Sequence, residues 1–224
     1  MTRNEEMAMS MVRLLDDVEL PLRSETPAAW AAGVLEDKLS LLNDHAHLEK
    51  KAGLNAIEML NRWPEPEPPE AWVQMMCGVA KDEVEHLAIV CRILHKRGGA
   101  ITKSHRNAYA KGLRDLIRIG KDTSCTGLID RLMVSALIEL RSCERFAVLA
   151  ENCEEDKELA NLYKGLWASE HGHYRTFLKM CYKVPTVSAD EVDARWDWFL
   201  DQEAAILAKQ PAGYGMHSGP CPRK

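Results

Sequence analysis

Two short motifs each place a glutamate and a histidine three residues apart, Glu83-Val-Glu-His86 and Glu170-His-Gly-His173. On an α-helix, residues three apart lie on the same face, so each motif can direct a carboxylate and an imidazole toward one point. One such motif is weak evidence, because both residue types are common on solvated helix faces. Two copies are much harder to attribute to chance, and this ligand type suits iron or manganese better than a metal that prefers thiolates.

The elements that must position these motifs are helical. Apolar residues recur with helical periodicity along nearly the whole chain, and no segment shows convincing strand alternation. The segment 63–70 contains four prolines and must be a loop, since proline is not tolerated inside a helix. Gly98 and Gly99 are typical of a helix end. We expect helices over residues 3–19, 27–62 (with a start at Gly33 as the alternative), 71–97, 105–119, 124–152, 156–182 and 189–209.

The four longest predicted helices pair into two hairpins, 33–62 with 71–97 and 124–152 with 156–182, joined by residues 98–123. Two helical hairpins with a long connection are what a ferritin-like bundle requires. The sequence therefore predicts an all-α fold, a ferritin-like four-helix bundle with additional N-terminal, connecting and C-terminal helices. We expect one domain over residues 1–224, with its core at about 30–182, the N-terminal helix within 1–25 and an irregular tail at 211–224.

Bundles that bind two metal ions also need a glutamate from each of the other two helices. In the first hairpin, Glu49 and Glu83 both lie about 17 residues from a loop centred near residue 66, at similar heights. The second hairpin offers Glu139 and Glu144. With a turn near residue 154, Glu139 matches the height of Glu170, whereas Glu144 lies roughly 9 Å too far along the axis. We select Glu139 and keep Glu144 as an alternative ligand or a supporting residue.

The predicted metal ligands are Glu49, Glu83, His86, Glu139, Glu170 and His173. The competing interpretation is that these acids form surface ion pairs with nearby lysines and arginines. Against it, the four glutamates would occupy inward helical positions, where unpaired carboxylates are costly and a metal ion satisfies them. Other histidines near the ligands could support them, but we expect exposure for His45, His47 and His171.

Charge and cysteine content limit the function classes. The net charge of −5 argues against a general nucleic-acid binder, yet residues 95–121 carry eight lysines and arginines against one acid, Asp115. That segment is either a solvated face or a phosphate-contacting patch. The seven cysteines include no CxxC pair, which argues against a rubredoxin-type iron site or a zinc ribbon. Without a long apolar run or a signal-peptide pattern, we expect a cytoplasmic protein.

Four runs resemble the bacterial tRNA-(2-methylthio-N6-isopentenyladenosine) hydroxylases. They are residues 41–52 (LLNDHAHLEKKA), 82–87 (DEVEHL), 137–146 (LIELRSCERF) and 169–174 (SEHGHY). The resemblance covers about residues 30–182, and its most distinctive part is RSCERF at 141–146, which other ferritin-like proteins do not require.

The resemblance implies a nonheme di-iron monooxygenase that hydroxylates the isopentenyl group of this adenosine beside the anticodon. Its partners would be tRNA, O2 and a separate electron-donor reductase, with no membrane association and a monomeric or dimeric state. It implies two iron ions, with manganese as a substitute, on the six ligands named above. The tRNA-contact candidates are Lys103, Arg106, Lys111, Arg114 and Arg118. The alternatives are a ferritin-like ferroxidase or iron-binding protein without a tRNA substrate, and a non-enzymatic helical adaptor.

Overall fold

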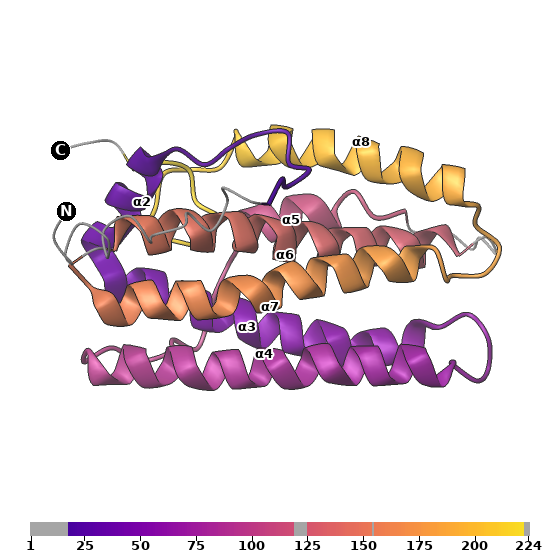
Figure 1. Ribbon diagram of the computed structural model, residues 1–224, viewed down its shortest axis with the longest axis horizontal. Helices are drawn as coiled ribbons and strands as arrows, with labels where there is room; N and C mark the ends of the chain where they lie inside the picture. The colour runs from indigo at the N-terminus through magenta and orange to yellow at the C-terminus, as the bar shows by residue number, and fades with distance from the viewer. Residues whose placement is uncertain (1–17, 119–124, 154, 222–224) are drawn as a thin grey trace, which may run out of the picture.

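The computed structural model describes residues 18–118, 125–153 and 155–221. Four long helices form two antiparallel hairpins, α3 (Lys38–Met59) with α4 (Glu70–Lys96) and α6 (Thr126–Asn152) with α7 (Lys157–Cys181). Figure 1 shows the two hairpins side by side, with α8 (Ala189–Leu207) along α6. The predicted all-α four-helix bundle is therefore confirmed. Residues 1–17 of the expected N-terminal helix lie outside the described part of the chain.

The helix expected over residues 27–62 is not continuous. It consists of α2 (Ala28–Val34), a 3-10 turn over Leu35–Asp37, α3 and a second 3-10 turn over Leu60–Arg62. Asp37 leaves the helical conformation, and its carboxylate accepts a hydrogen bond from the Ser40 backbone at 2.9 Å. An aspartate in this position caps a new helix and thus ends the preceding one.

The connecting helix α5 (Ala108–Arg114) is shorter than the predicted span of 105–119. Asn107 caps its start by accepting a hydrogen bond from the Ala110 backbone at 2.8 Å. Beyond its end, the Arg118 backbone N–H donates to the Asp130 carboxylate of α6 at 2.8 Å. This bond between distant residues directs the chain away from the helical path, which local sequence does not reveal.

The other breaks agree with the sequence. The proline-rich segment is a loop between Arg62 and Glu70. After α4, Gly98 adopts φ +82°, a left-handed conformation that favours glycine, and the Gly99 N–H donates to the Leu94 carbonyl at 3.0 Å. None of the helices within the described ranges is long and apolar enough to cross a membrane.

The core has two apolar clusters, and the predicted metal ligands lie between them. On α4, Met76 belongs to the first cluster and Val90 to the second, with Glu83 and His86 between. The same order recurs on α3 and α7, and on α6 Glu139 lies at the edge of the first cluster, between Leu137 and Leu140. The polar residues at mid-height are therefore enclosed by apolar packing at both ends, which places them in a poorly solvated environment.

The tail is irregular but fixed to the bundle. Residues 211–221 form no helix, yet Met216 is fully buried. Its backbone N–H donates to Asp44 at 2.7 Å, and its carbonyl accepts from the Arg145 guanidinium. The tail therefore covers one end of the bundle beside α3 and α6.

Candidate metal centre

The six predicted ligands meet at mid-height in the bundle, and each is at most 7% exposed. Their donor atoms form two overlapping groups, in each of which all donors lie within 4.8 Å of one another. The first group is Glu49, Glu83, His86 and Glu170, and the second is Glu83, Glu139, Glu170 and His173. Two carboxylates belong to both groups, so the arrangement has room for two adjacent cations sharing ligands.

Both imidazoles direct Nδ1 toward the carboxylates. His86 Nδ1 lies 3.1 Å from Glu170 Oε1 and 3.5 Å from Glu49 Oε2. His173 Nδ1 lies 2.8 Å from Glu83 Oε1 and 3.4 Å from Glu170 Oε2. The two rings are 6.0 Å apart, centroid to centroid. His86 Nδ1 thus faces carboxylates of α3 and α7, and His173 Nδ1 faces one of α4 and one of its own helix, α7.

These close approaches do not have hydrogen-bond geometry. Five donor atoms of the cluster are buried without a hydrogen-bond partner among the described residues. They are Nδ1 of His86 and of His173, Oε1 of Glu83 and both carboxylate oxygens of Glu170. Burying a polar atom without a partner costs about 1–3 kcal/mol, and more for a charged group. Donors that converge without bonding one another are what a metal ion would satisfy. The residues therefore fit a metal centre of carboxylates and imidazoles.

Burial and mutual repulsion shift the pKa values within the cluster. Burial, followed by the Glu170 charge, raises the pKa of Glu83 well above its usual range, and burial with the Glu83 charge does the same for Glu139. Burial alone would lower the histidine pKa values, but Glu170 and its neighbours raise that of His86 to about 10 and that of His173 to about 11. Without a cation, the cluster therefore retains protons that a bound cation would displace.

Two further residues hold the ligands, and sequence reasoning did not assign them. His45 is buried, contrary to the expected exposure, and its Nε2 lies 2.5 Å from Glu49 Oε1. Asp82 Oδ2 lies 3.4 Å from His173 Nε2. Partners of this kind orient ligands. His45 precedes Glu49 by four residues, so helical spacing could have identified it.

His47 also differs from expectation. It is buried, its Nε2 lies 3.0 Å from the Thr102 hydroxyl, and its ring stacks on His105. His171 is half-buried and stacks on Trp167. Neither His47 nor His171 belongs to the groups of potential metal ligands.

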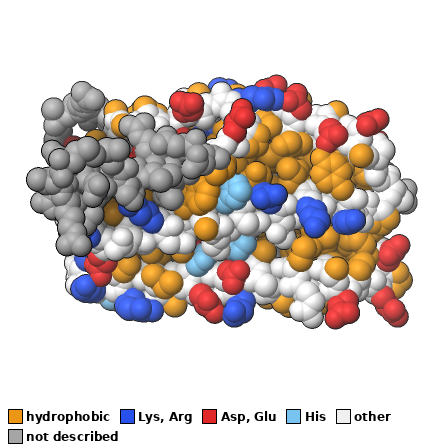
Figure 2. Space-filling model, in the orientation of Figure 1, with side chains coloured by type: hydrophobic (Ala, Val, Ile, Leu, Met, Phe, Trp, Pro, Cys, Tyr) orange, Lys and Arg blue, Asp and Glu red, His pale blue; other side chains and the backbone are white. Residues whose placement is uncertain are grey.

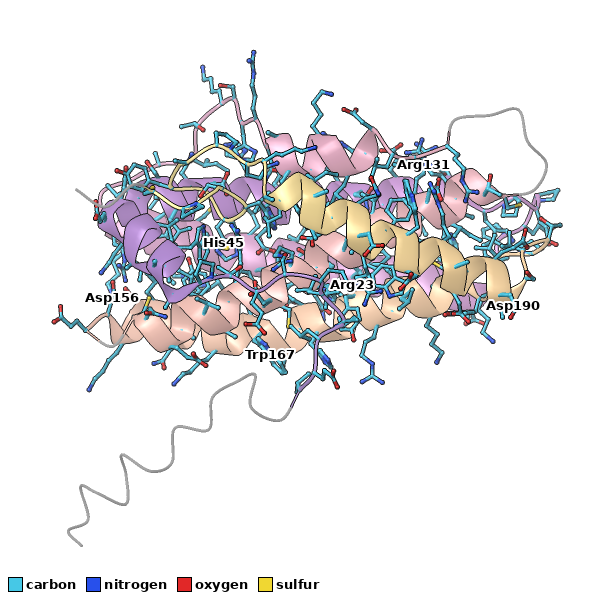
Figure 3. All side chains as sticks on the ribbon, turned by 90° about the horizontal axis from the view of Figure 1, so that it is seen from above. Arg23, His45, Arg131, Asp156, Trp167 and Asp190 are labelled. Carbon is cyan, nitrogen blue, oxygen red and sulfur yellow. The ribbon has the colours of Figure 1, made fainter. Side chains whose placement is uncertain are left out.

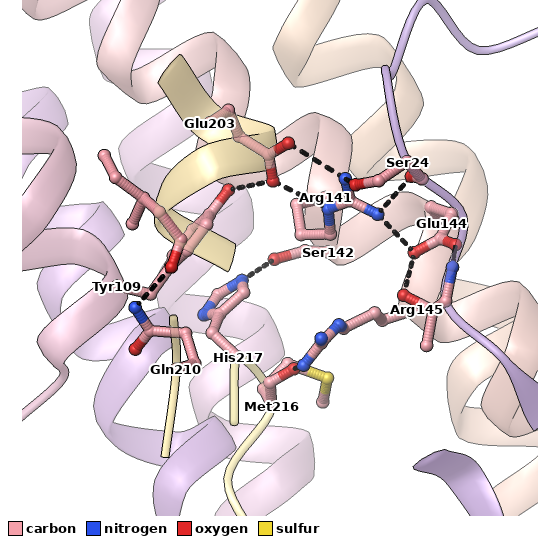
Figure 4. A network of polar contacts seen from close by, with 12 residues as sticks. Ser24, Tyr109, Arg141, Ser142, Glu144, Arg145, Glu203, Gln210, Met216 and His217 are labelled. Carbon is pink, nitrogen blue, oxygen red and sulfur yellow. Dashed lines mark hydrogen bonds and ion pairs between the residues drawn. The ribbon is translucent and has the colours of Figure 1, made fainter. Parts of the chain in front are cut away.

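Glu144, the alternative to Glu139, lies outside the cluster. Its carboxylate accepts hydrogen bonds from the Thr26 backbone at 2.5 Å and the Thr26 hydroxyl at 2.7 Å. It also accepts one from Arg141 at 3.1 Å (Figure 4). Glu139 is the α6 glutamate that the structure brings beside Glu83 and Glu170. Because the two glutamates lie at different heights along α6, Glu139 faces the cluster and Glu144 faces Thr26 and Arg141.

The RSCERF run builds a buried network around α6 (Figure 4). Arg141 is fully buried and donates to both oxygens of Glu203 on α8, at 2.8 and 2.9 Å. Tyr109 of α5 donates to the same carboxylate at 2.9 Å. Arg145 donates to the Ser218 carbonyl at 3.0 Å and lies over the Trp30 ring. The run thus ties α2, α5, α8 and the tail to the helix that carries Glu139.

A pocket with a cavity of about 120 Å³ leads to the cluster from the side of α3, α5 and α6. Glu49, Glu83, Glu139 and Glu170 line its inner part. Its apolar lining comes mainly from Leu48, Ala52, Ile117, Val134, Ile138 and Phe146. Figure 3 shows two further lining residues, His45 and Arg131, well apart along the bundle. The pocket can therefore hold an elongated, partly apolar molecule beside the metal ligands.

The predicted tRNA-contact residues have different environments. Lys103 and Arg106 are exposed, and Lys111 pairs with Asp115, the residue directly after α5. Arg118 donates to both oxygens of the buried Asp130, at 2.8 and 2.9 Å, and shares that carboxylate with Arg195. Arg114 lines the pocket.

Fold and site together define a ferritin-like protein with a buried cluster of carboxylates and histidines that could hold metal ions. The chain belongs to a known family, described as tRNA-(MS[2]IO[6]A)-hydroxylase (MiaE), whose model matches residues 13–218. This confirms the resemblance noted in the sequence.

Two relatives support this assignment, and one solved structure shares the fold. The chain is 34% identical over 180 residues to the tRNA 2-(methylsulfanyl)-N(6)-isopentenyladenosine(37) hydroxylase of Pseudomonas putida. The aligned region covers 80% of this chain and 82% of that protein. It is 32% identical over 158 residues to the enzyme of the same name from Salmonella typhimurium, covering 69% of this chain and 56% of that protein. The fold matches a Synechococcus protein with aldehyde deformylating oxygenase activity at a TM-score of 0.79 and 28% identity, covering 91% and 97% of the two chains.

Proposed function

We propose that this protein hydroxylates the isopentenyl group of 2-methylthio-N6-isopentenyladenosine beside the anticodon of tRNA, in the cytoplasm and with O2 as oxidant. The observation that carries the proposal is a set of buried, unpartnered metal-ligand atoms at the inner end of a pocket. Membership in the hydroxylase family and the names of both relatives supply the substrate.

We assign two iron ions to the cluster, with manganese as a substitute. Glu49 and His86 would hold one ion, Glu139 and His173 the other, and Glu83 and Glu170 would contribute to both. When bound, a pair of ferrous ions supplies the electrons that reduce dioxygen and the oxidising power that cleaves an unactivated C–H bond.

The side chains around the cluster position the substrate and keep water away. Leu48, Val134 and Ile138 would contact the isopentenyl group and hold it near the carboxylates. The apolar clusters above and below keep the site dry, which protects a reactive centre from side reactions. His45 and Asp82 hold Glu49 and His173 in place.

The reaction also needs partners outside the chain. One oxygen atom enters the product and the other leaves as water, so each turnover takes up two electrons and two protons. We assign the electrons to a separate reductase, because the cysteine spacing offers no iron–sulfur motif of its own. The modified nucleoside must leave its stack to enter a pocket, as bases acted on by enzymes generally do.

The decisive experiment supplies the protein with ferrous iron, a reductant, labelled O2 and tRNA bearing the modified nucleoside. The digested nucleosides are then analysed by mass spectrometry. We expect one labelled oxygen atom on the isopentenyl nucleoside.

Two variants of neighbouring glutamates provide the comparison. Glu83→Ala should abolish the product and bind less iron, whereas Glu85→Ala, which changes an exposed residue paired with Lys81, should behave as wild type. Stoichiometric bound iron without a product would refute the hydroxylase assignment in favour of ferroxidase activity or iron binding.

A further inference from the structure

Three cations from three different helices line the pocket that leads to the metal ligands: Lys51 of α3, Arg114 of α5 and Arg131 of α6. Only Arg114 belongs to the basic segment noted in the sequence. The other two lie far from it in the chain, so packing alone brings the three together. They share the pocket with Glu49 and Glu139.

Two of these cations lack acidic partners. Within the described ranges, no carboxylate lies within ion-pair distance of the Arg114 or Arg131 guanidinium, unlike Arg118, which binds Asp130. Arg114 contributes, after burial, to lowering the pKa of Lys51, so the two side chains are close enough to repel each other. Guanidinium groups in a pocket that form no ion pair there are stabilised by an anionic ligand.

Lys51 is held in position by hydrogen bonds through His105. Its ammonium group donates to His105 Nδ1 at 2.8 Å. Since that nitrogen accepts, Nε2 of the same ring carries the proton and donates to Asp44 at 2.6 Å. These hydrogen bonds orient the lysine without placing an acid directly against it.

The order of residues along α6 matches the parts of a nucleotide. Arg131 precedes Glu139 by eight residues, a rise of about 12 Å. Between them, the pocket is lined by the apolar Val134 and Ile138 and by Ser135, which accepts a hydrogen bond from Asn55 at 2.9 Å. Along α6, a cation thus lies at one end, apolar and neutral polar groups in the middle, and a carboxylate at the other.

We propose that Lys51, Arg114 and Arg131 form a phosphate-binding rim that grips the RNA backbone on either side of the nucleotide inserted in the pocket. The proposal rests on the proposed function, because the tRNA substrate supplies the phosphates. Arginine binds phosphate through paired N–H donors and lysine as a point charge. The rim positions the substrate, while the carboxylate end carries the chemistry.

The test compares two triple variants of the iron-loaded protein. The rim variant is Lys51→Gln, Arg114→Gln and Arg131→Gln. The control is Lys81→Gln, Lys164→Gln and Lys179→Gln, which removes the same charge from exposed residues of α4 and α7. Figure 2 shows lysine and arginine side chains exposed in a row across the middle of the face that it draws, with most of the acids nearer its upper and lower edges.

Binding of an anticodon stem-loop RNA is measured over a range of salt concentrations. Each lost phosphate contact should reduce the slope of log Kd against log salt by about 0.7, so the rim variant should lose about 2, with affinity at least about tenfold weaker. If the triple variant unfolds, Arg114→Gln alone should reduce the slope by about 0.7.

Failure of the rim and failure of the proposed function give different results. If the rim variant binds RNA with the affinity and salt slope of the control, the phosphate-binding role of the rim is refuted, even if the wild type makes the hydroxylated product. Rim-dependent RNA binding by a wild type that makes no product supports the rim and overturns the proposed reaction.

Discussion

Glu139 and Glu144 are predicted to have opposite phenotypes. Glu144 makes three hydrogen bonds, to Thr26 and Arg141, and it is 5% exposed. Removing one partner of a buried ion pair costs about 3–5 kcal/mol, because the remaining charge loses its compensation. Glu144→Ala should therefore lower the free energy of unfolding by about that amount, while the iron content of the folded protein stays at the wild-type level.

Glu139→Ala should do the reverse. Glu139 is buried beside Glu83 and Glu170, whose charges raise its pKa further above the value that burial alone gives. Removing it relieves repulsion in the metal-free protein, so we expect little or no loss of stability. Iron binding, however, loses one ligand, and the bound iron per chain should fall well below the wild-type value.

Unfolding and metal content must be measured separately to see this contrast. Urea unfolding with a chelator present reports the stability of the metal-free protein, since bound metal would add its own stabilisation. A loss of 3–5 kcal/mol corresponds to a shift in Tm of roughly 6–20 °C for a chain of this size. Metal analysis after iron loading reports the ligands. Iron loss in folded Glu144→Ala together with full iron content in Glu139→Ala would refute the reasoning.

Three further predictions concern pH, ligand orientation and the buried network. The pKa values of His86 and His173 are raised to about 10 and 11, so the folded metal-free protein keeps protons that the unfolded chain loses near pH 6.5. Urea unfolding of the metal-free protein should therefore show a free energy of unfolding that falls from about pH 7 toward pH 10. Iron binding displaces these protons, so competition titrations should show affinity rising with pH, and a flat profile would contradict the assignment. Asp82→Asn should weaken metal binding by about 10–100-fold in the same titrations with unchanged unfolding, and equal affinity would remove its orienting role. Arg141→Met should destabilise the protein by about 3–5 kcal/mol in urea unfolding, and Arg141→Met with Glu203→Met should restore part of that loss; an additive loss would contradict the pairing.

The sequence by itself determined the bundle and the inward residues of its four long helices. The two ExxH motifs follow from helical periodicity, and the heights of Glu49 and Glu139 follow from counting residues to each turn. Both are one-dimensional quantities, since a helix advances by a constant rise. That is why Glu139, and not Glu144, could be placed beside Glu170 before any contact was known.

Only the tertiary structure decided how the residues around the cluster are used. Arg118 is paired with Asp130, and the tail returns to Asp44 across 172 residues, through contacts that no local pattern encodes. Lys51 and Arg131 reach one pocket because α3 and α6 pack beside α5. Periodicity shows which face of a helix points inward, but the neighbours of that face depend on how the helices pack, which is set by burial over the whole bundle.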